Sequence, residues 1–212
     1  MTRTYIRTVR LRKWFPPNDS LAASVARLCI LREDLLLEFH GIYAEEIKQI
    51  DEHSAEWRRL YFLRSAIRTL GEMKQVVDRL QMHREFKKGL ASRPSKERDE
   101  FKKLVKQLNA EQQLVKQLRD SLGGHVLEGA VQKALDGMHP ERLGFFEVGK
   151  ILNSTHYKFA IELVAEILVS GVPDNQRVAR LEDVFSRLGA LLPIIAITDQ
   201  IVLTYLISRD LI

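Results

Sequence analysis

The chain contains a single cysteine, Cys29, among its 212 residues. One cysteine cannot form a disulfide within the chain, which excludes a disulfide framework and fits a reducing cytoplasm. Because Cys29 lies between Leu28 and Ile30 on an apolar helical face, we expect a buried packing residue rather than a nucleophile.

The sequence also lacks the signatures of common metal and nucleotide sites. It has no paired cysteines for zinc, no glycine-rich loop of the kind that cradles phosphates and no strand-elbow serine motif. The Glu-x-x-His spacing of di-iron bundles does not occur, and only Asp136 and His139 come close, beside Pro140. We therefore predict that the protein uses no metal and no cofactor.

Long uninterrupted apolar runs are scarce. The first fifteen residues carry five basic residues with no apolar core behind them, so we expect no secretory signal. The one membrane candidate, residues 188–207, is interrupted by Pro193, Asp199 and Gln200. We predict instead a buried C-terminal helix that is kinked at Pro193, with no membrane partner.

Packed helices are what the composition favours. Hydrophobic residues make up 45% of the chain but aromatic residues only 8%, and apolar side chains recur at helical spacing in every long segment. We predict an all-α helical bundle of about six helices, with more than about 60% of the residues helical. The expected helices span approximately residues 21–39, 54–82, 95–122, 126–138, 154–168 and 175–206.

The remaining segments are predicted to be turns or extended chain. Residues 5–15 alternate imperfectly between polar and apolar types, which indicates a short strand or an extended arm. Residues 89–94 predict a turn, and residues 143–148 predict an extended segment or a loop. We expect a basic arm over residues 1–17 and one helical domain over residues 18–212.

Charge is unevenly distributed along the chain. The basic residues of the N-terminal arm account for the net charge of +5, and an acidic block over residues 33–56 precedes a basic block over residues 84–106. The blocks fit a phosphate-bearing partner, or a solvated face with an acid-to-base contact between neighbouring helices. Trp57, Tyr61 and Phe62 lie among arginines and could form a nucleic-acid face, but core aromatics with solvated arginines are favoured at this spacing.

The clearest candidate for chemistry is Arg-Asp-Ser-Leu-Gly-Gly-His, residues 119–125, at the end of a predicted helix. A guanidinium group holds phosphate in a two-pronged contact, and an imidazole moves a proton near neutral pH. Gly123 and Gly124 tolerate positive φ, so a sharp reversal could bring Arg119 and His125 together. The alternative is structural: Arg119 complements the helix C-terminus, Gly123 is an ordinary cap and His125 is buried between helices.

These residues resemble the HEPN superfamily, whose members carry an Arg, usually followed by Asn, Asp or His, and a later His after four to six residues. Arg119, Asp120 and His125 fit this pattern, and the resemblance covers about residues 60–132. It implies a helical bundle, which many members pair into a dimer with two motifs at one cleft. Active members are metal-independent RNases, often toxins or phage-defence components, whereas others have lost catalysis and bind partners.

The resemblance implies a role for each site residue. His125 would deprotonate the ribose 2′-hydroxyl or protonate the leaving 5′-oxygen, Arg119 would hold the phosphoryl oxygens, and Asp120 would orient either side chain. One histidine cannot be acid and base at once, so a homodimer would supply the second. The 2′-hydroxyl would restrict the substrate to RNA. The competing hypothesis is a non-catalytic helical module that binds a protein partner or RNA.

Overall fold

The computed structural model of the chain describes residues 9–43, 52–123, 126–145 and 157–211. In these ranges 80% of the residues are helical and none forms a strand, which confirms the all-α class. The elements are α1 (Leu11–Trp14), α2 (Ser20–Tyr43), α3 (Glu52–Met82), α4 (Arg84–Ala91), α5 (Ser95–Ala110), α6 (Gln112–Leu122), α7 (Glu128–Gly137), α8 (Phe159–Val169), the 3-10 turn η2 (Asp174–Gln176), α9 (Arg177–Gly189) and α10 (Ile194–Ser208).

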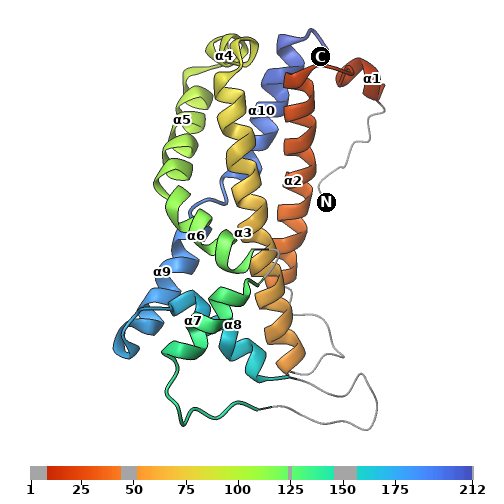
Figure 1. Ribbon diagram of the computed structural model, residues 1–212. Helices are drawn as coiled ribbons and strands as arrows, with labels where there is room; N and C mark the ends of the chain where they lie inside the picture. Colours follow the sequence, from red (N-terminus) through yellow and green to blue (C-terminus); the bar gives the residue numbers. More distant parts are fainter. Residues whose placement is uncertain (1–8, 44–51, 124–125, 146–156, 212) are drawn as a thin grey trace, which may run out of the picture.

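The helices form an elongated bundle with a second group of helices at one end (Figure 1). Helices α2, α3, α5 and α10 run along its length, and α4 closes the end near the C-terminus. Helices α7, α8 and α9 lie at the opposite end. The short helix α6 packs against α3 and touches α8, so the end of α6 lies where the two groups meet.

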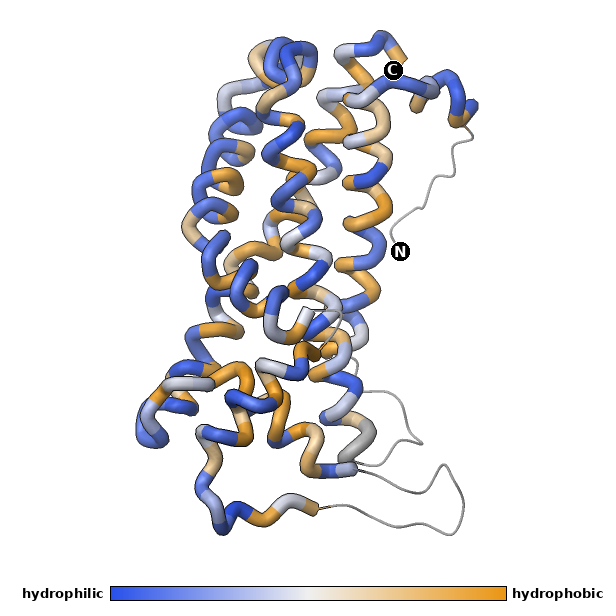
Figure 2. Tube along the Cα trace, in the orientation of Figure 1, coloured by the Kyte–Doolittle hydropathy of each residue, from blue (hydrophilic) through white to orange (hydrophobic). Residues whose placement is uncertain are grey.

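Apolar spacing explains why the long helices form and how they pack. On α3, the expected apolar face recurs at three-, four- and seven-residue intervals. Leu60 is partly buried, and the others are buried: Leu63, Ile67, Leu70, Val77 and Leu80. Figure 2 shows apolar positions recurring along each bundle helix, with polar positions between them. Burial of one such leucine or isoleucine stabilises the fold by about 1.5–3 kcal/mol, so these stripes hold the bundle together.

The described residues form more helices than the about six expected, because two predicted long helices are broken. The predicted helix over 95–122 is interrupted at Glu111, which separates α5 from α6. The predicted helix over 175–206 is interrupted between Gly189 and Ile194, where Pro193 has no N–H to donate. The break before Ile194 agrees with the expected kink at Pro193. The helix α4 differs from the prediction: residues 84–91 are helical, and the predicted turn is confined to residues 92–94.

The expected extended or short-strand arm is not found in the described residues. Residues 11–14 form the short helix α1, and residues 1–8 lie outside the described ranges. The chain next to α1 is fixed by α10: the Tyr205 hydroxyl donates a hydrogen bond to the Trp14 carbonyl oxygen, and the Phe15 ring stacks on the Tyr205 ring at 5.9 Å. These contacts with α10 explain why the arm is not extended. The polar and apolar alternation within the arm cannot reveal contacts with a helix so distant in the sequence.

The segment Asp174–Ser208 is long and apolar enough to cross a membrane by length and composition. This is weak evidence for a membrane helix, because core helices of bundles have the same composition. Here α10 packs against α2, α4 and α5, and its Asp199 forms an ion pair with Arg32 at 2.9 Å. The expectation of a packed C-terminal helix thus agrees with the contacts of α10.

Candidate functional site

Arg119 lies in the last turn of α6, and its side chain is one-third exposed. Its Nη2 and Nε atoms both donate to Oδ1 of Asp120, at 2.9 and 3.1 Å. An exposed ion pair of this kind contributes only about 0–1 kcal/mol to stability. A phosphate could therefore replace Asp120 as the partner of Arg119 at little cost.

The stem of Arg119 lies on Gly71 of α3. A Cβ added to Gly71 would come 3.4 Å from Arg119 Cδ and 3.6 Å from Val115 Cγ1. These are ordinary van der Waals distances, so α6 packs directly on α3 at this point, and Val115, Leu118 and Leu122 bury the apolar face of α6. This packing fixes the position from which the guanidinium group projects.

The end of α6 is held by backbone hydrogen bonds. Gly123 N donates to Arg119 O at 2.9 Å, and Arg64 Nε on α3 donates to Leu122 O at 3.0 Å. Gly123 has φ −74°, so the tolerance of glycine for positive φ is not used at this position. Glycine is needed there for a different reason: a Cβ would lie 2.8 Å from Arg119 Cα. Gly124 and His125 lie outside the described residues.

A small hollow of about 120 Å³ opens beside Arg119, between α3 and the α5–α6 pair. Its charged lining comprises Lys74, Asp78, Lys116 and Arg119. Lys74 is paired with Asp78, since its Nζ lies 2.6 Å from Asp78 Oδ1. The other basic residues of the lining are Lys116 and Arg119. Since a water molecule occupies about 30 Å³ in the liquid, the hollow has room for a few waters or one phosphoryl group.

A larger hollow of about 690 Å³ lies on the other side of α6. Gln117 and Ser121 line it from α6, Lys133 from α7 and Arg180 from α9. Helical geometry turns Gln117 and Ser121 roughly 160–200° away from Arg119, so the two hollows flank the same helix. The volume of the larger hollow is within the range of small-molecule sites. The sequence did not indicate this hollow, because its walls come from helices distant in the chain.

One face of α3 carries a row of exposed or partly exposed aromatic and basic side chains. Trp57, Tyr61, Arg64 and Arg68 follow one another at three- and four-residue intervals, which places them on one face, and Gly71 continues the row beneath Arg119. We call these four side chains the α3 stripe. Tyr61 is 58% exposed and Trp57 is 36% exposed, so the expectation that they are core aromatics is wrong. They lie on a different face from Leu63 and Ile67, the residues that face the bundle.

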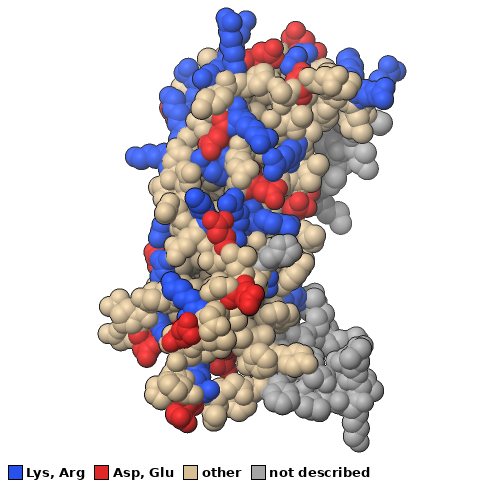
Figure 3. Space-filling model, viewed as in Figure 1, with Lys and Arg blue, Asp and Glu red and all other residues tan. Residues whose placement is uncertain are grey.

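Basic and acidic side chains are interleaved on the surface shown in Figure 3, with lysine and arginine more abundant over much of it. Within the described ranges, lysine and arginine residues of the basic block pair with acidic residues close by in the sequence. Arg93, just before α5, pairs with Glu97, and Lys102 pairs with Asp99 on α5. No ion pair described by the structure joins the acidic block to this basic block. Residues 44–51 of the acidic block lie outside the described ranges, so the contact between the blocks stays a prediction.

The other candidates for chemistry are weaker. In the parts of the chain that the structure describes, no group of three or more His, Cys, Asp or Glu side chains could hold a metal ion. Cys29 is half-buried rather than fully buried, and desolvation raises the pKa of its thiol. A raised pKa lowers the thiolate fraction, which disfavours Cys29 as a nucleophile.

No protein-family model matches the chain, and no curated protein or solved structure matches it either. The HEPN resemblance therefore depends on the motif residues themselves.

Proposed function

We propose that the protein binds single-stranded RNA along the α3 stripe and cleaves it, without a metal, at the end of α6. Arg119 holds the phosphodiester and His125 transfers a proton. The observation that carries this proposal is an alignment: Gly71 continues the row of the α3 stripe along the helix, and the Arg119 side chain covers Gly71.

The α3 stripe has the chemistry of a single-strand platform. Exposed aromatic rings stack on bases of any sequence, and arginines contact phosphates. Tyr61 and Trp57 supply the rings, and Arg68 is exposed beside them. Base stacking contributes about 1–3 kcal/mol per base, which is enough to position a strand before cleavage.

Arg119 supplies charge stabilisation at the scissile phosphate. As the 2′-oxygen attacks phosphorus, negative charge accumulates on the non-bridging oxygens, and a guanidinium fork stabilises that charge. Asp120 now accepts from both Nε and Nη2 through one oxygen, so it keeps the fork oriented until phosphate replaces it. Asp120 is thus a positioning residue in this proposal.

His125 is assigned by the sequence motif. In the sequence His125 follows Gly123, the residue at the end of α6, by two positions. In the proposed reaction the 2′-oxygen forms a bond to phosphorus, and the bond to the 5′-oxygen breaks. One His125 takes the 2′ proton and another protonates the leaving 5′-oxygen, giving a 2′,3′-cyclic phosphate. A homodimer supplies the two histidines.

The wider setting of this activity rests on the HEPN resemblance alone. That resemblance favours a cytoplasmic homodimer that acts as a toxin or in phage defence or stress. The large hollow on the other side of α6 needs no role in the cleavage step.

The test compares RNA cleavage by the wild type and by His125→Ala in excess chelator. We expect His125→Ala to lose about 100- to 10,000-fold in rate, because proton transfer by a positioned side chain contributes that much. His40→Ala is the matched control, since His40 is exposed on α2, and it should cleave at the wild-type rate. Unchanged cleavage in His125→Ala would remove His125 from the mechanism.

A second candidate function is RNA binding without cleavage. The Arg119–Asp120 ion pair favours it, because a fork already occupied by a carboxylate is satisfied without substrate. In that case the wild type binds single-stranded RNA but leaves it intact, and Tyr61→Ala weakens binding. Absence of both binding and cleavage would remove both candidates and leave a protein-binding module.

A further inference from the structure

A groove of about 410 Å³ lies between α2 and α3, near the α3–α4 joint. Ser20, Ser24 and Arg27 line it from α2, and Arg79 and His83 line it from the other side. On each helix these residues recur at three-, four- or seven-residue intervals, so they share one face. The groove therefore collects three potential cations and two hydroxyl groups from two packed helices.

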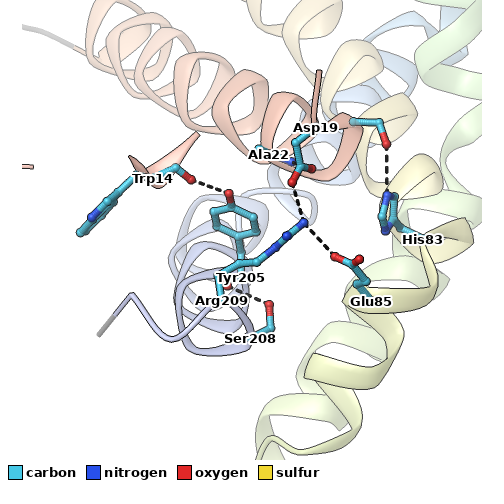
Figure 4. Close-up of polar contacts among 9 residues, drawn as sticks. Trp14, Asp19, Ala22, His83, Glu85, Tyr205, Ser208 and Arg209 are labelled. Carbon is cyan, nitrogen blue, oxygen red and sulfur yellow. Dashed lines mark hydrogen bonds and ion pairs between the residues drawn. The ribbon is translucent and has the colours of Figure 1, made fainter. Parts of the chain in front are cut away.

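The basic side chains of this groove are incompletely neutralised. Arg27 pairs with Glu72 at 3.2 Å, but both side chains are 36% exposed. Arg79 is exposed and has no acidic partner among the residues that the structure describes. Two nearby carboxylates, Asp19 and Glu85, both contact Arg209, at 2.6 and 2.8 Å (Figure 4). Arg209 thereby offsets the acidic groups that would otherwise repel an anion from the groove.

The end of the groove is held in place by a hydrogen bond between the helices. Ser20 Oγ and His83 Nε2 are 3.2 Å apart. The His83 backbone joins α3 to α4, because its N–H donates to Leu80 O at 3.0 Å and its carbonyl accepts from Lys87 N at 3.1 Å. His83 Nδ1 is buried and has no hydrogen-bond partner in the described part of the chain. That nitrogen has no exposed surface, so the ligand contacts come from the arginines and serines that line the groove.

We propose that this groove binds a phosphoryl group on a ligand of mononucleotide size. Guanidinium groups and serine hydroxyls are common phosphate donors, and the groove volume is within the range of small-molecule sites. This site is separate from Arg119 and does not depend on RNA cleavage.

Calorimetric titration of the full chain with AMP, adenosine and inorganic phosphate tests the proposal. We expect AMP to bind, adenosine not to bind, and Arg79→Ala to weaken AMP binding by at least about tenfold, because a charge-assisted contact is lost. Arg59→Ala is the control, since Arg59 is exposed on the same helix twenty residues away and the charge change is identical. It should leave AMP affinity within about twofold.

Two results overturn the proposal: adenosine binding as tightly as AMP, or Arg59→Ala and Arg79→Ala weakening AMP equally. A lack of AMP and phosphate binding at millimolar concentration also overturns it. Titration with a short RNA that carries a 5′-phosphate or a 5′-hydroxyl identifies the source of the group. A preference for the phosphorylated RNA over AMP indicates a strand end, and equal affinity indicates a free mononucleotide.

Discussion

The bundle of α2, α3, α5 and α10 and the end formed by α7, α8 and α9 are stabilised in different ways. Every bundle helix buries an apolar stripe, and α2 alone buries Leu21, Val25, Leu28, Leu31 and Leu35. In α7, by contrast, Ala134 is the only fully buried residue, and α8 buries a carboxylate, Glu166, that pairs with Arg177 at 2.6 Å. The end formed by α7, α8 and α9 also buries apolar side chains, chiefly Val164, Ile167, Leu168 and Val169 of α8, and adds the buried ion pair at Glu166. Arg119 and Asp120, at the end of α6, lie where these two parts meet.

The largest difference should appear on truncation of apolar side chains. Ile67 is completely buried in the bundle, so Ile67→Ala should lower the free energy of unfolding by about 2–5 kcal/mol, through lost burial and a cavity. Leu135 on α7 is 48% exposed, and Leu135→Ala should cost less than about 1 kcal/mol. Urea unfolding measures both. Equal losses would contradict the contrast between the two parts.

A smaller effect is expected from the ion pair that links α8 to α9. Arg177→Ala leaves the Glu166 carboxylate buried without its cation, which should cost about 1–3 kcal/mol. Arg180→Ala is the matched control one turn later, because Arg180 pairs with the exposed Asp183 and such pairs contribute about 0–1 kcal/mol. If thermal melting shows the same loss for both variants, the charged contact at Glu166 is not what stabilises this end.

The bundle contains one buried carboxylate whose replacement should raise stability. Ser65 and Thr69 donate to Oε1 of Glu38, at 2.6 and 2.9 Å, while Oε2 is buried with no partner in the described residues. Burial raises the pKa of Glu38, so the folded protein binds this proton more tightly than the unfolded chain does. The contribution of this proton to the free energy of unfolding is fully present below about pH 4.3, the ordinary pKa of glutamate. It is lost as the pH rises through the raised pKa of Glu38 in the folded protein.

Glu38→Gln should therefore raise the melting temperature at pH 7 by about 2–4 °C, which corresponds to about 1 kcal/mol for a chain of this size. The gain should shrink as the pH falls toward 4, where wild-type Glu38 is protonated. Glu33→Gln on the exposed side of α2 should show neither the gain nor its pH dependence. A gain that grows at acid pH would contradict the assigned cause.

The sequence predicted the helical class and the buried faces of α2 and α3 because their apolar spacing is regular over many turns. It missed the breaks at Glu111 and before Ile194 and the helix α4, since tertiary packing decides where neighbouring helices begin and end. It also placed Trp57 and Tyr61 in the core, because periodicity identifies one face of a helix but not which residues stay uncovered. Of the proposed catalytic residues, Arg119 and Asp120 are described at the end of α6, whereas His125 is still a prediction.

The most direct test of the proposed function is the rate of RNA cleavage by Arg119→Lys in excess chelator. Lysine keeps the positive charge but cannot form the two-pronged contact, so the rate should fall by about 100-fold or more. The melting temperature should stay within about 2 °C of the wild type, because the Arg119–Asp120 pair is exposed. Arg59→Lys, elsewhere on α3, should cleave normally. Cleavage by Arg119→Lys at the wild-type rate would contradict the assignment of Arg119 to the scissile phosphate.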